Sequence, residues 1–226
     1  MLNFFKEVFK KGELRRKVVF TLGILFVFRL GAGIVIPYID TSAITSAATS
    51  SGIFGIMNML GGGTLEKFSL FSLGVSPYIT SSIIIELLSM DVVPALTQWN
   101  KEGNTGKKKK DKVTRVLTLA LAIIQGGSLT YAFDKGYSIL ASSSIWTYVY
   151  VVIVMAAGSM FTMWLGDQIT IKGVGNGTSL LIFTGIVANL PNSFISSFKS
   201  MVTFGSTYKT ATSLAWYILF VLVYLA

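Results

Sequence analysis

Hydrophobic and polar positions alternate along the chain in long blocks. Apolar runs of about bilayer length occupy residues 18–36, 70–90, 116–133, 145–165 and 174–190, and a sixth begins near Ser213. Because a helix needs about 20 apolar residues to cross the hydrocarbon core, this pattern predicts an all-α polytopic membrane protein. The sixth run has only 14 residues before Ala226, so we expect the chain to be a fragment that stops within a membrane helix.

The charged residues predict the orientation of these helices. The net charge is +9, and the basic residues cluster in the amphipathic stretch 1–17 and in the polar segment 91–115. Cytoplasmic loops carry an excess of Lys and Arg, which places both segments in the cytoplasm. Segments 134–144 and 191–212 are then external, and 166–173 is a short inner loop.

Segment 40–69 must begin and end on the outer side for this orientation to hold. It contains a short apolar stretch, Ile53–Leu60, followed by three glycines, Gly61–Gly63. Irregular backbone is tolerated at membrane depth only where protein or a water-filled cavity surrounds it. The segment is therefore either a re-entrant piece beside a cavity or an ordinary external loop with a surface helix.

The second apolar run carries a glycine and a proline in its middle. Pro77 removes a backbone donor and Gly74 eases bending, so we expect this helix to be kinked or open there. Val75, Ile79 and Ile83 follow at helical spacing and form one aliphatic stripe. Such a stripe is typical of packing or lipid-facing surfaces, and a pore lining is the alternative.

The glycine-rich stretch "GDQITIKGVGNGTSLLIF" (166–183) superficially resembles a phosphate loop. It lacks a preceding strand and the Lys-Ser/Thr that such a loop requires. We interpret it as a tight turn in which Asn176 or Thr178 caps the next helix, with Thr178 and Ile182 on one face.

Charged residues near the apolar runs have two interpretations. Lys107–Lys110, with Lys112 and Arg115, form a basic tip that either reflects the positive-inside rule alone or docks an anionic partner. Arg29 and Glu86 lie within apolar runs, where charge is costly and often functional.

Cysteine and histidine are both absent. Their absence excludes disulfides, thiolate nucleophiles, histidine bases and the usual zinc, iron or haem ligands. We expect no enzymatic activity, no cofactor and no metal.

Three stretches resemble the SecY/Sec61-alpha family of protein-conducting channels, and within it the bacterial SecY proteins. They are "FRLGAGIVIPYID" (28–40), "GGGTLEKFSLFSLGVSPYITSSIIIELL" (61–88) and "MWLGDQITIKGVGNGTSLLIFTGIVANLP" (163–191). The resemblance implies the first five-helix half of a ten-helix inverted-repeat channel, in residues 18–190, followed by an external loop (191–212) and the start of helix six (213–226). Such a channel passes unfolded preproteins across the cytoplasmic membrane and releases transmembrane segments sideways into lipid.

The resemblance also implies residue roles. Thr80 and Gln125 match lateral-gate positions, and the tip residues with Arg115 match a ribosome- or SecA-contacting loop. The matched pore ring, in which Thr178 stands where the family usually has Ile, is Val75, Ile79, Thr178 and Ile182. The implied plug residues are Ile53, Phe54, Ile56, Met57, Met59 and Leu60, hinged at Gly61, Gly62 and Gly63, and the matched contact residues are Lys107, Lys108, Lys109, Lys110 and Arg115.

The implied setting is a bacterial cytoplasmic membrane, with the N-terminus inside. The partners it implies are SecE, SecG, the SecA ATPase, the ribosome with its 23S rRNA and exit-tunnel proteins, preprotein signal sequences, membrane lipids, SecDF and YidC. An alternative from the residues alone is an inverted-repeat secondary transporter that uses the broken second helix with Arg29 or Glu86.

Overall fold

The computed structural model describes residues 12–40, 64, 65, 67–90, 92–140, 144–201 and 217. The predicted plug 53–60 and its glycine hinge 61–63 lie outside these residues. In the described part the chain has no β-strand, only two isolated bridges, so the all-α prediction is confirmed there. The helices are α2 (Gly12–Ala32), α5 (Ser76–Leu88), α6 (Pro94–Lys101), α7 (Asn104–Tyr137), α8 (Ile145–Lys172) and α9 (Gly177–Met201).

Two of these helices are long and apolar enough to cross a membrane. They are α7, over Asn104–Gly136, and α8, over Ile145–Lys172. Shorter apolar helices cover Ser76–Leu88 and Gly177–Ala188.

The chain divides into two compact units, Met1–Gly185 and Ile186–Ala226. In the second unit the rings of Phe198 and Tyr217 meet edge to face, with centroids 5.2 Å apart. All site residues considered below belong to the first unit.

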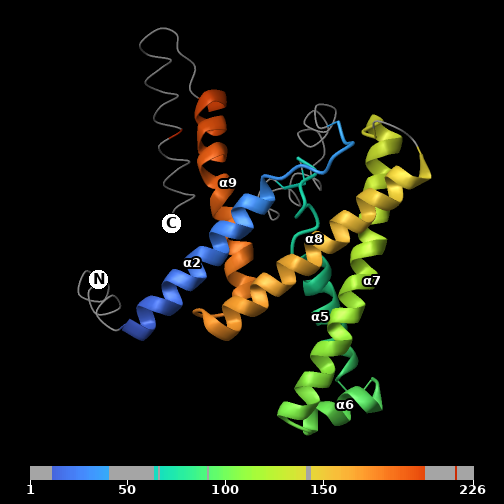
Figure 1. Ribbon diagram of the computed structural model, residues 1–226, viewed down its shortest axis with the longest axis vertical. Coiled ribbons are helices and arrows are strands. Elements are labelled where there is room, and N and C mark those ends of the chain that lie inside the picture. Colours follow the sequence, from blue (N-terminus) through green and yellow to red (C-terminus); the bar gives the residue numbers. More distant parts are fainter. Residues whose placement is uncertain are drawn as a thin grey trace. The chain divides into compact units, whose positions relative to one another are not determined.

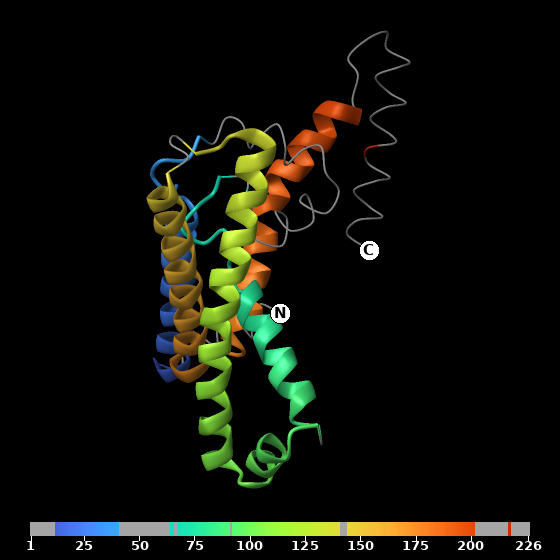
Figure 2. The same ribbon diagram turned by 90° about the vertical axis from the view of Figure 1, so that its right-hand side faces the viewer.

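In the first unit α7 is the central helix. It contacts α5, α6 and α8, while α2 packs against α8. Figures 1 and 2 show α6 beside the first turns of α7, at the end opposite to the α7–α8 connection. The described part of the unit therefore has one end made by the α6–α7 hairpin and another made by residues 33–40, 67–75 and 138–140.

Two apolar clusters form the core. One joins α7 and α8 around Ala122, Phe133, Val151 and Met155. The other joins α2, α8 and the start of α9, where Phe28 stacks on Phe71 with ring centroids 5.5 Å apart. Segment 68–75 supplies side chains to both clusters and so connects them.

The prediction of a second helix over 70–90 is wrong at its beginning. Residues 67–75 are non-helical, and their backbone pairs instead with segment 34–36, since the Leu70 amide donates to the Ile34 carbonyl at 2.8 Å. Helix α5 starts at Ser76, which places Pro77 in its first turn, where the missing N–H costs nothing. Pro77 therefore starts a helix and does not kink one.

Three predicted loops are shorter than expected or absent. Within the predicted loop 91–115, α6 begins at Pro94 and α7 begins at Asn104. Helix α8 continues to Lys172 through the predicted loop 166–173. Helix α9 passes Pro191 and ends at Met201, within the predicted loop 191–212. The turn between α8 and α9 is accordingly only 173–176.

Candidate functional site

An aliphatic cavity of about 610 Å³ lies between α5, α7 and the start of α9. Three of the four predicted ring residues, Val75, Ile79 and Ile182, line it. Phe28, Leu73 and Leu181 extend the apolar lining. We call this space the aliphatic cavity.

The backbone around Gly74 directs Val75 and Ile79 into this cavity. Gly74 has φ +51°, a left-handed conformation that favours glycine, and the Ser159 hydroxyl donates to its carbonyl at 3.0 Å. Val75 caps α5, and its carbonyl accepts the Ile79 amide at 3.0 Å. The two side chains are therefore held one helical turn apart by a turn that α8 anchors.

A close approach of α8 supports the same turn. A Cβ atom added at Gly158 would overlap the carbonyl oxygen of Leu70. Only glycine allows the backbone of segment 68–75 to lie this close to α8.

Polar side chains also line the aliphatic cavity. Thr80 of α5 and Gln125 of α7, the predicted gate residues, line the same cavity. The Thr80 hydroxyl donates to the Ser76 carbonyl at 3.0 Å, within its own helix. The structure thus brings the two gate positions together with three ring positions.

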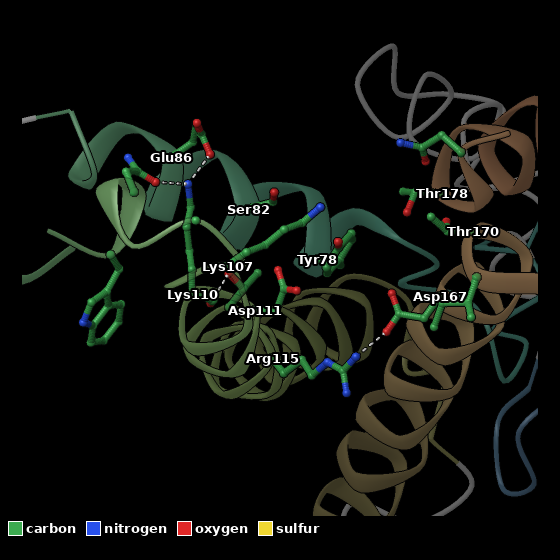
Figure 3. A pocket seen from close by; sticks show the side chains of 16 residues that line it. Tyr78, Ser82, Glu86, Lys107, Lys110, Asp111, Arg115, Asp167, Thr170 and Thr178 are labelled. Carbon is green, nitrogen blue, oxygen red and sulfur yellow. Dashed lines mark hydrogen bonds and ion pairs between the residues drawn. The ribbon is translucent and has the colours of Figure 1, made fainter. Parts of the chain in front are cut away.

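A second cavity of about 620 Å³ lies nearer the α6 end of the unit, and we call it the charged cavity. Figure 3 shows Glu86 facing Lys110 and Arg115 facing Asp167 across it. Both pairs have N···O distances of 2.7 Å. The first ties α5 to α7, and the second ties α7 to α8.

The predicted basic tip is in fact part of a helix. Lys107–Lys110 occupy the first turns of α7, and the true turn between α6 and α7 is at Glu102–Gly103. Lys109 pairs with Glu102 at 2.8 Å and lies over the Trp99 ring. Lys107 lines the charged cavity, whereas Lys108 and Lys112 are exposed and make no ion pair within the described residues.

Thr178 departs from the predicted ring. It lines the charged cavity together with Asn176 and does not line the aliphatic one. Figure 3 shows Thr178 beside Thr170 in the charged cavity. Of the two predicted capping residues it is Asn176 that caps α9, because its side-chain oxygen accepts the Ser179 amide at 3.2 Å. Capping places Thr178 within the first turn of α9, one turn away from Ile182.

Ile83, the third residue of the predicted stripe, lines neither cavity and is 55% exposed. The stripe therefore ends at Ile79 as far as the aliphatic cavity is concerned.

Sequence reasoning missed a buried hydroxyl cluster between α5 and α7. The Ser81 hydroxyl donates to the Thr114 carbonyl at 2.9 Å and lies 2.8 Å from the Thr118 hydroxyl. Ser81 and Thr118 are fully buried. Small hydroxyl residues in an apolar run were the available signal, since they allow helices to approach closely and bond across the contact.

Among the described residues there is no group of three or more His, Cys, Asp or Glu side chains that could hold a metal ion.

The family profile and the curated relatives that match this chain agree on one family. The SecY family profile matches residues 69–226. A protein translocase subunit SecY 1 from Lactobacillus kefiranofaciens is 44% identical over 89% of this chain and 47% of its own length. The SecY subunits of Bacillus subtilis and Staphylococcus aureus are 41% and 40% identical over 93% and 96% of this chain. The chain spans about half the length of these relatives.

Solved structures agree on the fold. The Sec61 channel in a canine ribosome-channel complex matches with a TM-score of 0.56 at 18% identity, covering 89% of this chain and 42% of that one. A structure described as a protein conducting channel matches with a TM-score of 0.55 at the same identity, covering 41% of its chain. With the profile matching well over half of the chain, this protein belongs to the SecY family.

Proposed function

We propose that this chain is the first half of the central subunit of a Sec protein translocase. The complete channel passes unfolded preproteins across the bacterial cytoplasmic membrane and releases transmembrane segments into lipid. The observation that carries this assignment is the convergence of Val75, Ile79 and Ile182 on one cavity, with Thr80 and Gln125 at its side.

An aliphatic lining suits a passive channel. Saturated side chains offer water and ions no hydrogen bonds, so a narrow apolar passage excludes them, yet such side chains can separate around a polypeptide. No catalytic group is needed for this task. In this proposal Ile53–Leu60 is a plug that adds a second seal, and Gly61–Gly63 is its hinge.

The partners are proposed from the resemblance to the SecY family. The relatives are called protein translocase subunits, and one structural neighbour was solved with a ribosome, which supports assembly into a translocase in general terms. We assign SecE, SecG and SecA as partners of the complete protein, with the ribosome, SecDF and YidC as further ones. The N-terminus and the α6–α7 hairpin face the cytoplasm in this assignment.

The environment of Glu86 counts against the alternative, a coupled transporter. Glu86 lies at the end of α5 and is ion-paired with Lys110 beside Asn100, in a cavity with three basic side chains. A midplane coupling site would instead isolate a titratable group within the apolar part of the bundle.

Conductance recordings on the complete protein in planar bilayers distinguish the two functions. Deleting residues 53–60 is expected to raise ion conductance, whereas Glu86→Gln leaves the low conductance of the parent unchanged. Substrate-dependent charge uptake that Glu86→Gln abolishes, with no leak on deletion of 53–60, would overturn the channel assignment.

A further inference from the structure

Helix α5 has three faces with different surroundings. Ile79 and Thr80 line the aliphatic cavity. The residues that line the charged cavity follow at four-residue spacing, as Figure 3 shows, and are Tyr78, Ser82 and Glu86. The buried residues follow at the same spacing and are Pro77, Ser81 and Ile85. Since successive residues of a helix point about 100° apart, a rotation of α5 by one residue about its axis would exchange these faces.

Apolar packing selects the observed rotation only weakly. Ile83, Ile84 and Ile85 are consecutive and point in three directions around α5. Ile85 is buried, Ile84 is partly buried and Ile83 is 55% exposed. Each rotation would bury the same type of side chain, and lipid surrounds an exposed isoleucine as favourably as protein does. Another interaction must therefore distinguish the rotations.

The hydroxyl cluster between α5 and α7 makes this distinction. Ser81 is fully buried, and both acceptors near its hydroxyl belong to α7, namely the Thr114 carbonyl at 2.9 Å and the Thr118 hydroxyl at 2.8 Å. The Thr118 hydroxyl in turn lies 2.7 Å from the Thr114 carbonyl and can donate to it. Whichever way the two hydroxyl protons are arranged, the Ser81 proton makes a hydrogen bond to α7.

The neighbouring contacts of α5 do not fix its rotation in this way. The Thr80 hydroxyl donates to the Ser76 carbonyl of its own helix. The Glu86 side chain, paired with Lys110, is 58% exposed, so this pair is weak and can follow a rotation. Hydrogen bonds depend on direction as well as distance, and Ser81 would lose both of its acceptors if α5 turned by one residue.

We propose that Ser81 is a positioning residue of the aliphatic cavity. Its hydrogen bond to α7 fixes the rotation of α5 that directs Ile79 into the aliphatic cavity and Ser82 into the charged cavity. The inference rests on the proposed channel function for its consequence, which is ion exclusion at Ile79. The rotation itself can be measured without conduction.

Cysteine labelling of the complete protein, with no other cysteine present, measures this rotation. A water-soluble maleimide should label Ser82→Cys readily in the hydrated charged cavity, and Ile79→Cys only slowly, through a minor rotated state. Adding Ser81→Ala should raise the labelling rate of Ile79→Cys about threefold, the typical effect of one hydrogen bond between membrane helices. The rate for Ser82→Cys should stay unchanged, since the observed rotation remains the major one.

Thr118→Val is the matched control. It removes one hydroxyl from the same cluster at nearly constant volume and leaves the Ser81 bond to the Thr114 carbonyl, so the labelling rate of Ile79→Cys should keep its parent value. Ser81→Ala leaves no buried polar group unpaired, because Thr118 still donates to the Thr114 carbonyl, and we expect this variant to fold.

Two results would overturn the positioning role of Ser81. One is an unchanged labelling rate of Ile79→Cys in Ser81→Ala, and the other is an equal rise in Ser81→Ala and Thr118→Val, which would indicate a general loosening of α5 from α7. Rapid labelling of Ile79→Cys in the parent is a different failure. It would show that Ile79 does not lie at a barrier, and would contradict the proposed channel function itself.

Discussion

The aliphatic cavity and the charged cavity share α5 as a wall and differ little in volume, about 610 and 620 Å³. Val75, which caps α5, and Ile79 face the first beside Ser76 and Thr80, whereas Tyr78, Ser82 and Glu86 face the second. Size therefore does not distinguish them, and the lining does. In the proposed channel, the first cavity is the barrier to ions and the second is a hydrated space.

The two cavities are also held together differently. Around the aliphatic cavity the main constraints are backbone contacts, such as Gly158 against Leu70 and the Ser159 bond to Gly74. Around the charged cavity they are the ion pairs Glu86–Lys110 and Arg115–Asp167. Packing against a backbone is rigid, whereas partly exposed ion pairs are weak and can exchange partners. We infer that the aliphatic cavity keeps its shape while the charged cavity rearranges.

The largest effect is expected where the rigid contact is broken. Gly158→Val drives a branched side chain into the Leu70 carbonyl and should destabilise the complete protein by about 3 kcal/mol. The midpoint of thermal unfolding should fall by roughly 3 to 6 °C, since the complete protein is about twice as long as this chain. Gly136→Val, where nothing lies within 4 Å, is the control. Equal midpoints for the two variants would show that segment 68–75 is free to move.

The next prediction tests whether the difference in lining makes only the aliphatic cavity a barrier to ions. Ile79→Asn removes an aliphatic group from the aliphatic cavity and should weaken the barrier to ions by about 2 kcal/mol, which is roughly a thirtyfold rise in leak conductance. Ser82→Asn makes a polar change one turn along α5, in the charged cavity, and should leave conductance unchanged. A similar leak in both variants would show that the two cavities do not differ as barriers.

A third effect separates the lysines that are engaged within the molecule from those that are exposed. Lys108→Ser with Lys112→Ser should weaken ribosome binding, and the log-log salt dependence should fall by about two because two phosphate contacts are lost. Lys109→Ser with Lys110→Ser removes the same charge from residues paired with Glu102 and Glu86, and should change binding less. Binding measured by co-sedimentation over a salt series checks this. If neither double variant changes ribosome binding, the basic cluster serves only to orient the protein in the membrane.

The smallest effect is expected for the ion pair across the charged cavity. A double-mutant cycle with Arg115→Gln and Asp167→Asn should give a coupling of about 0.5 to 1 kcal/mol that decreases in high salt. Denaturation of the complete protein measures it. A coupling of several kcal/mol would mean that the charged cavity is as rigid as the aliphatic one.

The sequence predicted the helical class and a cap at Asn176 or Thr178, because these depend on hydropathy and on local geometry. The grouping of Val75, Ile79 and Ile182 came instead from the family resemblance, and the structure places these three residues at one cavity.

The sequence did not predict that residues 70–75 are non-helical. Their apolar composition fits a helix equally well. The non-helical conformation is selected by distant contacts, namely the hydrogen bond to the Ile34 backbone and the close approach at Gly158. Pro77 was the available local signal that a helix begins at this point, because proline is favoured in the first turn of a helix.

The loop predicted for the basic cluster Lys107–Lys110 was wrong for a different reason. Positive side chains at a helix N-terminus are unfavourable, because the positive end of the helix dipole lies there. Local rules therefore favour a loop for Lys107–Lys110. The ion pairs with Glu102 and Glu86 offset that cost. Both acids lie before the cluster, in segments whose proximity only the fold reveals. Asp167 was likewise assigned to a loop, because its partner Arg115 is 52 residues away in sequence.

The central claim is that a polypeptide passes through the aliphatic cavity. Because the sequence contains no cysteine, single cysteines can be placed at Ile79, Ile182, Ile83 and Ile124 of the complete protein and cross-linked to a preprotein arrested in transit. Cross-links from Ile79 and Ile182, which line the cavity, with none from Ile83 and Ile124, which do not, are the predicted result. Cross-links from Ile83 or Ile124 in the absence of any from Ile79 and Ile182 would contradict it.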